Sequence, residues 1–97
     1  MAGEDKVLGA KIFSVVGPRI AKRREELGLS QEKLAELAGL HRTAISPLEL
    51  GKHGTWVVTV FRIAAVLRVP PVELLDGVYL DLDSEEFTDR PPPKDDA

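Results

Sequence analysis

The sequence predicts an all-α domain of five short helices, followed by a flexible acidic tail. Two patterns favour helices: apolar residues recur at helical spacing, and glycines such as Gly28, Gly39 and Gly51 follow these stretches. A chain of 97 residues suits one small hydrophobic core. We therefore expect a domain at residues 15–77, an N-terminal extension at 1–14 and a largely disordered tail at 78–97.

The first two helices are marked by their ends. One is expected from Pro18 to Leu27, where charged residues surround the apolar positions and Gly28 is a left-handed stop. Residues 1–5 should be frayed, and residues 6–17 are apolar without a clear period. The next helix begins after Ser30 as N-cap and ends at Gly39. Its inner face should hold Leu34, Leu37 and Ala38.

The third helix is expected from about His41 to Leu50, with Ile45 and Leu48 facing inward. Pro47 lies inside this range, where it removes one backbone donor and crowds the preceding turn. The segment that starts at Ser46 also has the local pattern of a new helix, but too few residues remain before Gly51. We therefore expect one continuous helix with a kink or a loosened hydrogen bond near Thr43.

The fourth helix competes with a strand. The β-branched and aromatic run Thr55–Phe61 favours a strand, whereas helical periodicity from Val60 to Leu67 favours a helix, and we follow the periodicity. Pro71 can begin a fifth helix that ends at Leu75. Residues 78–83 signal a strand only weakly, and the acidic, proline-containing segment 84–97 is typical of disorder.

Composition excludes several functions. The sequence has no cysteine, so a disulfide framework, a thiolate metal site and a cysteine nucleophile are excluded. Its two histidines, His41 and His53, are too few for a metal site, and no catalytic constellation is present, so we expect neither cofactor nor enzyme activity. The longest uncharged stretch, His53–Phe61, is too short for a membrane span. The charged N-terminus does not resemble a secretory signal, so a cytoplasmic location is expected.

The charge is divided unevenly along the chain. Residues 1–75 hold eleven Lys and Arg and eight Asp and Glu, a net charge of +3. Residues 76–97 hold two and eight, a net charge of −6. The mildly basic body can therefore approach nucleic acid although the whole chain is acidic, while a mixed-sign surface without such a role is the alternative.

The residues of the second and third helices carry a resemblance to a known family. A small Ala35 suits a close helix crossing, and Gly39 permits the tight turn between the helices. Matching residues run in register from about 16 to 75: Arg24, Gly28, Leu29, Ser30, Gln31, Leu34, Ala35, Ala38, Gly39, Ile45, Ser46, Leu48, Glu49, Gly51, Ile63, Ala64, Leu67 and Leu74. With them the sequence resembles the helix-turn-helix domain of the phage repressor and Cro family, also called the Xre family.

The resemblance implies a role for each matching position. Arg42, Thr43 and Pro47 match base-reading positions, and Ala44 and Ser46 lie close by. Arginine can pair bidentately with guanine, so Arg42 is the best candidate. Phosphate contacts are implied for four further residues: Gln31, Lys52, His53 and Trp56. The alternatives are a solvated loop for Lys52 and His53, and partial burial for Trp56.

Arg24 and Glu49 match a pair that forms a salt bridge in the family, so they should tie the third helix to the first. The implied function is a sequence-specific transcriptional regulator that binds double-stranded DNA as a homodimer on a palindromic operator. One variant is an antitoxin or restriction-system controller. The alternative is a protein-interaction module, antitoxin-like or adaptor, that binds a protein partner and has weak or no DNA affinity.

Overall fold

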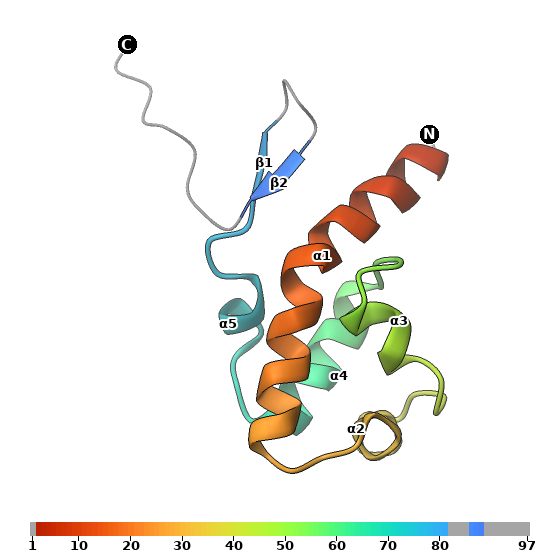
Figure 1. Cartoon of the computed structure of the whole chain (residues 1–97), viewed down its shortest axis with the longest axis vertical. Coiled ribbons are helices and arrows are strands. Elements are labelled where there is room, and N and C mark those ends of the chain that lie inside the picture. Colours follow the sequence, from red (N-terminus) through yellow and green to blue (C-terminus); the bar gives the residue numbers. More distant parts are fainter. Residues whose placement is uncertain (1, 82–85, 89–97) are drawn as a thin grey trace.

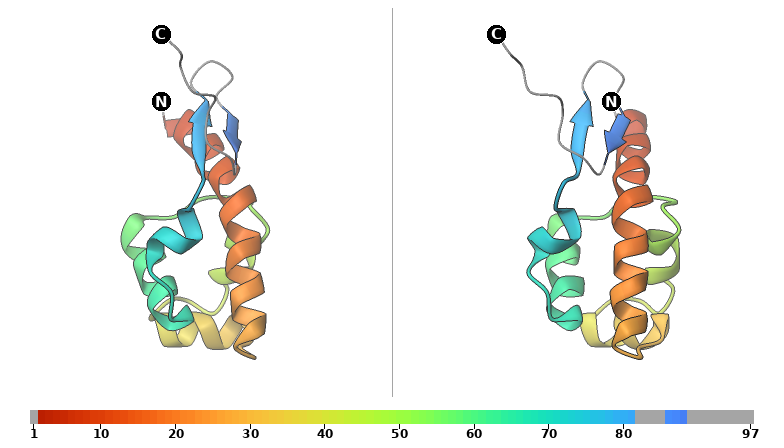
Figure 2. Two further views of the ribbon diagram at one scale, coloured as in Figure 1. Left: turned by 90° about the vertical axis from the view of Figure 1, so that its left-hand side faces the viewer. Right: turned by 60° about the vertical axis from the view of Figure 1, so that its left-hand side comes forward.

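The computed structural model describes residues 2–81 and 86–88, which form five helices and one short hairpin (Figure 1). In chain order these are α1 (Ala2–Glu26), α2 (Gln31–Ala38), α3 (Ile45–Glu49), α4 (Val57–Leu67), α5 (Pro71–Leu75), β1 (Tyr79–Asp81) and β2 (Glu86–Thr88). The predicted all-α fold class is confirmed. The shorter helices gather around the C-terminal half of α1, and the hairpin lies beside its N-terminal half (Figures 1 and 2).

The core is mostly aliphatic and joins all five helices. Its fully buried side chains include Val16, Ile20, Leu34, Ile45, Leu48, Ile63 and Leu67. The expected inward positions of α3 and α4 are therefore confirmed. Leu37 is 53% exposed, which corrects its expected place on the inner face of α2, because Ala35 lies on the buried face with Leu34 and Ala38 instead.

Helix α1 is much longer than predicted. It begins at Ala2 instead of Pro18 and runs without a break through the expected boundary between residues 14 and 15. Phe13 and Val16 are buried in the core, so tertiary packing stabilises a segment whose periodicity is unclear. Pro18 lies in the interior of this helix and is exposed.

Helix α3 is shorter than predicted, and it corrects our interpretation of Pro47. The helix begins at Ile45, with Ala44 as its N-cap, and therefore does not start near His41. Pro47 is consequently the third helical residue, where a backbone N–H has no partner within the helix in any case. The carbonyl of Thr43, with which a proline ring would clash in a longer helix, lies outside α3. The expected continuous, kinked helix is thus wrong.

Helix α4 resolves the conflict between strand and helix in favour of the helix. Residues 57–67 are helical despite their β-branched composition, because Val60, Ile63, Ala64 and Leu67 form one buried face. The helix ends at Arg68, which adopts a left-handed conformation with φ of 59°. The predicted start of α5 at Pro71 is also confirmed.

The hairpin corrects the prediction of a disordered tail. β1 and β2 pair in antiparallel register, with Leu80 opposite Phe87, and β2 contacts α1. Pairing with a neighbouring strand and contact with α1 supply structure that the composition of residues 86–88 does not signal. The remainder of the expected disordered segment, 84, 85 and 89–97, lies outside the described residues. Among the helices described, none is long and apolar enough to cross a membrane.

Candidate nucleic-acid interface

Helices α2 and α3 and the turn between them form one compact unit. The Ser30 hydroxyl accepts a hydrogen bond from the Lys33 backbone N–H at 2.9 Å, which satisfies one free donor at the start of α2. Gly39 ends α2 with φ of 73°, and the Leu40 N–H closes the turn on the Ala35 carbonyl at 2.8 Å. The chain therefore leaves α2 in one defined direction and enters α3 after six residues, 39–44.

An ionic cluster holds α3 against the scaffold. The Arg24 guanidinium donates to both carboxylate oxygens of Glu49, from Nε at 2.6 Å and from Nη2 at 3.0 Å. Its third nitrogen donates to the Leu29 carbonyl at 2.8 Å. The hydrogen bonds to Glu49 raise the pKa of Arg24 above its ordinary value, against the opposing effect of burial. The two residues that the family resemblance pairs are thus in direct contact.

Gln31 is a third member of the cluster, a feature that the sequence did not reveal. Its side-chain amide donates to Glu49 Oε1 at 2.8 Å. One amide hydrogen of the half-buried side chain expected to touch a phosphate is therefore engaged by Glu49. The second hydrogen of the Gln31 amide and the free backbone N–H groups at the start of α2 remain as donors for an anion there. A polar residue at the first position of a helix is a weak signal, and only the fold brings Gln31 to Glu49.

The expected base-reading residues lie on the outward side of the unit, but not on one helix. Arg42 and Thr43 are exposed in the turn before α3, whereas Ser46 and Pro47 are half-buried in its first turn. Ala44 is half-buried as the N-cap. The expected base-reading residues therefore come from a turn and from the start of a helix.

His41 is exposed beside the expected base-reading residues, and the sequence analysis did not foresee its contact with Thr43. The Thr43 N–H donates to His41 Nδ1 at 3.2 Å, and the Thr43 hydroxyl lies 2.7 Å from the same nitrogen. These local bonds stabilise the turn and give its backbone an alternative to the helix. The pattern His-x-Thr is the only signal in the sequence, and it is a weak one.

The loop after α3 presents polar and aromatic side chains to solvent. Lys52 and His53 are exposed, and His53 Nδ1 lies 2.9 Å from the Gly54 carbonyl oxygen. Trp56 is 82% exposed at the N-cap of α4, so the alternative of its burial under the loop is wrong. The indole N–H is consequently accessible to a partner outside the chain.

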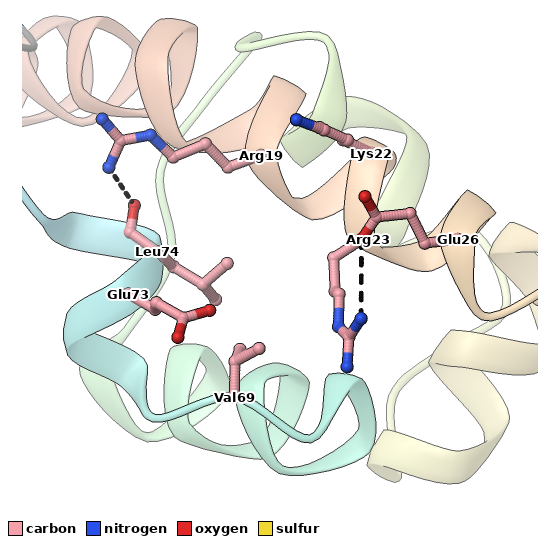
Figure 3. A pocket seen from close by; sticks show the side chains of 7 residues that line it. All are labelled: Arg19, Lys22, Arg23, Glu26, Val69, Glu73 and Leu74. Carbon is pink, nitrogen blue, oxygen red and sulfur yellow. Dashed lines mark hydrogen bonds and ion pairs between the residues drawn. The ribbon is translucent and has the colours of Figure 1, made fainter.

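A cavity of about 200 Å³ lies elsewhere, between α1 and α5 (Figure 3). It is smaller than a typical ligand pocket. Its arginines are engaged in structural bonds: Arg19 donates to the carbonyls of Leu74 and Asp76, and Arg23 to that of Leu67. These bonds hold α5 and the end of α4 against α1, so the two arginines of this cavity serve the scaffold.

Comparison with known proteins identifies residues 20–74 as a helix-turn-helix domain. The family model described as helix-turn-helix matches residues 20–74, more than half of the chain. An uncharacterized HTH-type transcriptional regulator, y4dJ of Sinorhizobium fredii, is 36% identical over 61 residues, which cover 63% of this chain and 79% of that protein.

Two solved structures have a similar fold. The restriction-modification controller protein C.AhdI from Aeromonas hydrophila is 35% identical, with a TM-score of 0.62. The match covers 64% of this chain and 94% of the C.AhdI chain. The P22 c2 repressor protein, in complex with synthetic operator 9T, is 28% identical with a TM-score of 0.61 and covers 65% of this chain and 96% of its own. The resemblance found in the sequence is therefore confirmed by the family match and by the fold.

Proposed function

We propose that the chain, which belongs to the helix-turn-helix family, is a sequence-specific transcriptional regulator that binds a palindromic operator in double-stranded DNA as a homodimer. The observation that carries this proposal is the ionic cluster of Arg24, Glu49 and Gln31. It fixes the inner side of α3 to the scaffold while Arg42 and Thr43 stay exposed on the outer side. Such a rigid, outward-facing unit suits insertion into a major groove.

Base reading rests mainly on Arg42 in this proposal. Its guanidinium can donate two parallel hydrogen bonds to the major-groove edge of a guanine. Thr43 offers a methyl group and a hydroxyl, although His41 already engages that hydroxyl. Ala44, Ser46 and Pro47 would contribute through shape and apolar contact, because Pro47 has no N–H to donate.

Phosphate contacts would frame this surface on both sides. The N-terminus of α2 offers backbone amides to a phosphate, and across the unit Lys52, His53 and Trp56 project from the loop after α3. Such contacts set the register of the protein on the duplex without reading sequence. The mildly basic body, at +3 over residues 1–75, agrees with an electrostatic contribution to binding.

The homodimer is supported by an exposed apolar surface on α4. Three side chains, which we call the α4 patch, are each at least 57% exposed: Val57, Val58 and Phe61. Contiguous exposed apolar side chains are typical of contact surfaces. A second copy of the chain would also double the few base contacts that one recognition surface makes. In this proposal the protein acts in the cytoplasm, without cofactor or catalytic activity.

Selection of bound sites from a random duplex library tests the function. We expect a recovered motif with two-fold symmetry and half-sites about one helical turn apart. Arg42→Ala should relax the preference at one position of each half-site, at a cost of about 1–3 kcal/mol. Lys22→Ala, which removes a positive charge beside the cavity between α1 and α5, is the matched control and should leave the motif unchanged.

A protein-interaction module remains the second candidate, because the α4 patch and the net charge of −6 over residues 76–97 both suit a protein partner. The same library separates the two functions. Failure of the wild-type chain to retain any duplex DNA at low salt would favour the module and reject the DNA-binding proposal. Recovery of a motif without symmetry would reject only the homodimer.

A further inference from the structure

The N-terminal half of α1 lies outside the residues that the family model matches, yet it touches the loop of the proposed phosphate contacts. The family match begins at residue 20, whereas α1 begins at Ala2. The loop after α3 crosses this helix twice, at Gly51 and at Gly54. These two glycines flank the exposed pair Lys52 and His53.

Both crossings are backbone contacts. A Cβ added to Gly54 would lie 2.9 Å from Gly9 Cα, and one added to Gly9 would lie 3.2 Å from the Gly54 nitrogen. At the other crossing, a Cβ on Gly51 would lie 2.9 Å from Ser14 Cα, and Gly51 has φ of 68°. Side chains would force these segments apart, so glycine permits the approach at each point.

We infer that the N-terminal half of α1 is a brace that fixes the conformation of the Lys52–His53 segment, with Gly9 and Gly54 as its positioning residues. Gly9 adds no side chain to the core, whereas Phe13 and Val16 of the same helix do. The contact of Gly9 with the loop is therefore its distinguishing feature. A segment already ordered in the free protein loses less conformational entropy when it binds, so the brace should favour binding.

The effect of the brace on DNA binding rests on the proposed function. The order of the Lys52–His53 segment does not, because it can be measured in the free protein. Trypsin can cleave after Lys52, between the two crossings, and needs local opening of the chain to do so. Cleavage at this bond is measured by mass spectrometry on the whole chain. Cleavage after Lys33 in the same molecule is the internal reference.

Gly9→Val places a branched side chain against Gly54 and should separate the helix from the loop. We expect cleavage after Lys52 to become about tenfold faster relative to cleavage after Lys33. Val7→Ala changes an exposed α1 residue without a change of charge and should leave the ratio as in the wild type. Gly9→Ala adds a single methyl group and raises helix propensity, so it should keep the melting temperature while still accelerating cleavage. Faster cleavage after Lys52 at an unchanged melting temperature would show that Gly9 positions the loop and does not only stabilise the fold.

DNA binding provides the second readout, as a double-mutant cycle between Gly9→Val and Lys52→Ala. If the brace acts through Lys52, the Lys52→Ala change should weaken binding to a random-sequence duplex in the wild type but have little further effect in Gly9→Val. Unchanged cleavage after Lys52 in both Gly9 variants would overturn the brace, whatever the DNA result. Fast cleavage in these variants, with no DNA binding by the wild type, would support the brace and reject the proposed function.

Discussion

Arg24 of α1 and Glu49 of α3 form a two-point ion pair, with Nε 2.6 Å from Oε2 and Nη2 3.0 Å from Oε1. Their side chains are 12% and 5% exposed. The pair therefore lies at the low-dielectric boundary between two helices, where removal of one partner leaves the other charge poorly solvated. Its position makes the stability of the fold and the placement of α3 depend on the same contact.

The first prediction concerns the energy of this pair. Arg24→Ala and Glu49→Ala should each lower the free energy of unfolding by about 3 kcal/mol, and the double variant by much less than the sum. Urea denaturation of the wild type, the two single variants and the double variant measures the coupling energy between the two side chains. The exposed pair Lys33 and Glu36, at 3.2 Å on α2, is the matched control and should couple by less than about 1 kcal/mol. Equal coupling in both pairs would show that burial does not strengthen the first.

The second prediction concerns the salt dependence of DNA binding. A lysine on a phosphate releases counterions, so Lys52→Ala should reduce the slope of log affinity against log salt by about one unit. Affinity should fall alike for specific and random duplexes, which fluorescence anisotropy can follow. Lys22→Ala removes the same charge beside the cavity between α1 and α5 and should leave the slope near that of the wild type. If both variants shift the slope equally, the effect belongs to net charge and not to a contact of Lys52.

The third prediction compares two prolines by the same substitution. Pro47 is the third residue of α3, so Pro47→Ala should lower stability slightly, by about 0.4–1 kcal/mol, because the unfolded chain gains freedom. Pro18 lies in the interior of α1, so Pro18→Ala should raise stability by about 1–3 kcal/mol through the restored hydrogen bond. Thermal and urea unfolding measure both. A gain above about 1 kcal/mol for Pro47→Ala would restore the kinked-helix interpretation.

The fourth prediction concerns the C-terminal segment. Deletion of residues 84–97 removes β2 and its contact with α1, so it should lower the melting temperature measurably. Deletion of residues 89–97 keeps β2 and should lower it less. The longer deletion also removes five acidic and two basic residues, so nonspecific DNA affinity at low salt should rise. Identical melting temperatures for the two truncated chains would show that β2 adds nothing to stability.

The fifth prediction concerns assembly through the α4 patch. Phe61, at 57% exposed, would be buried in a homodimer formed on this surface, so Phe61→Asp should shift sedimentation toward the monomer. Leu37→Asp places the same charge at a 53% exposed site on α2 and should leave the sedimentation as in the wild type. Monomeric wild-type protein at all concentrations would reject the patch as a homodimer contact.

Local signals predicted much of the fold because they act over a few residues. Ser30 and Gly39 mark α2, Pro71 marks α5, and the spacing of Val60, Ile63 and Leu67 identifies α4. Each of these is a property of consecutive backbone atoms or of one helix face, so it can be recognised without a partner segment. The family is likewise recognisable in the linear order of the chain.

Tertiary contacts decided the parts of the fold that local signals do not predict. The N-terminal half of α1 is helical although its own periodicity predicts no helix. Phe13 and Val16 are buried in the core, and Gly9 packs against Gly54, so tertiary packing stabilises this segment. The same holds for the engagement of Gln31 with Glu49, and for β2, which needs β1 as a neighbour. Where a residue's conformation depends on groups far away in the sequence, local propensity is weaker than packing, and only the folded chain brings those groups together.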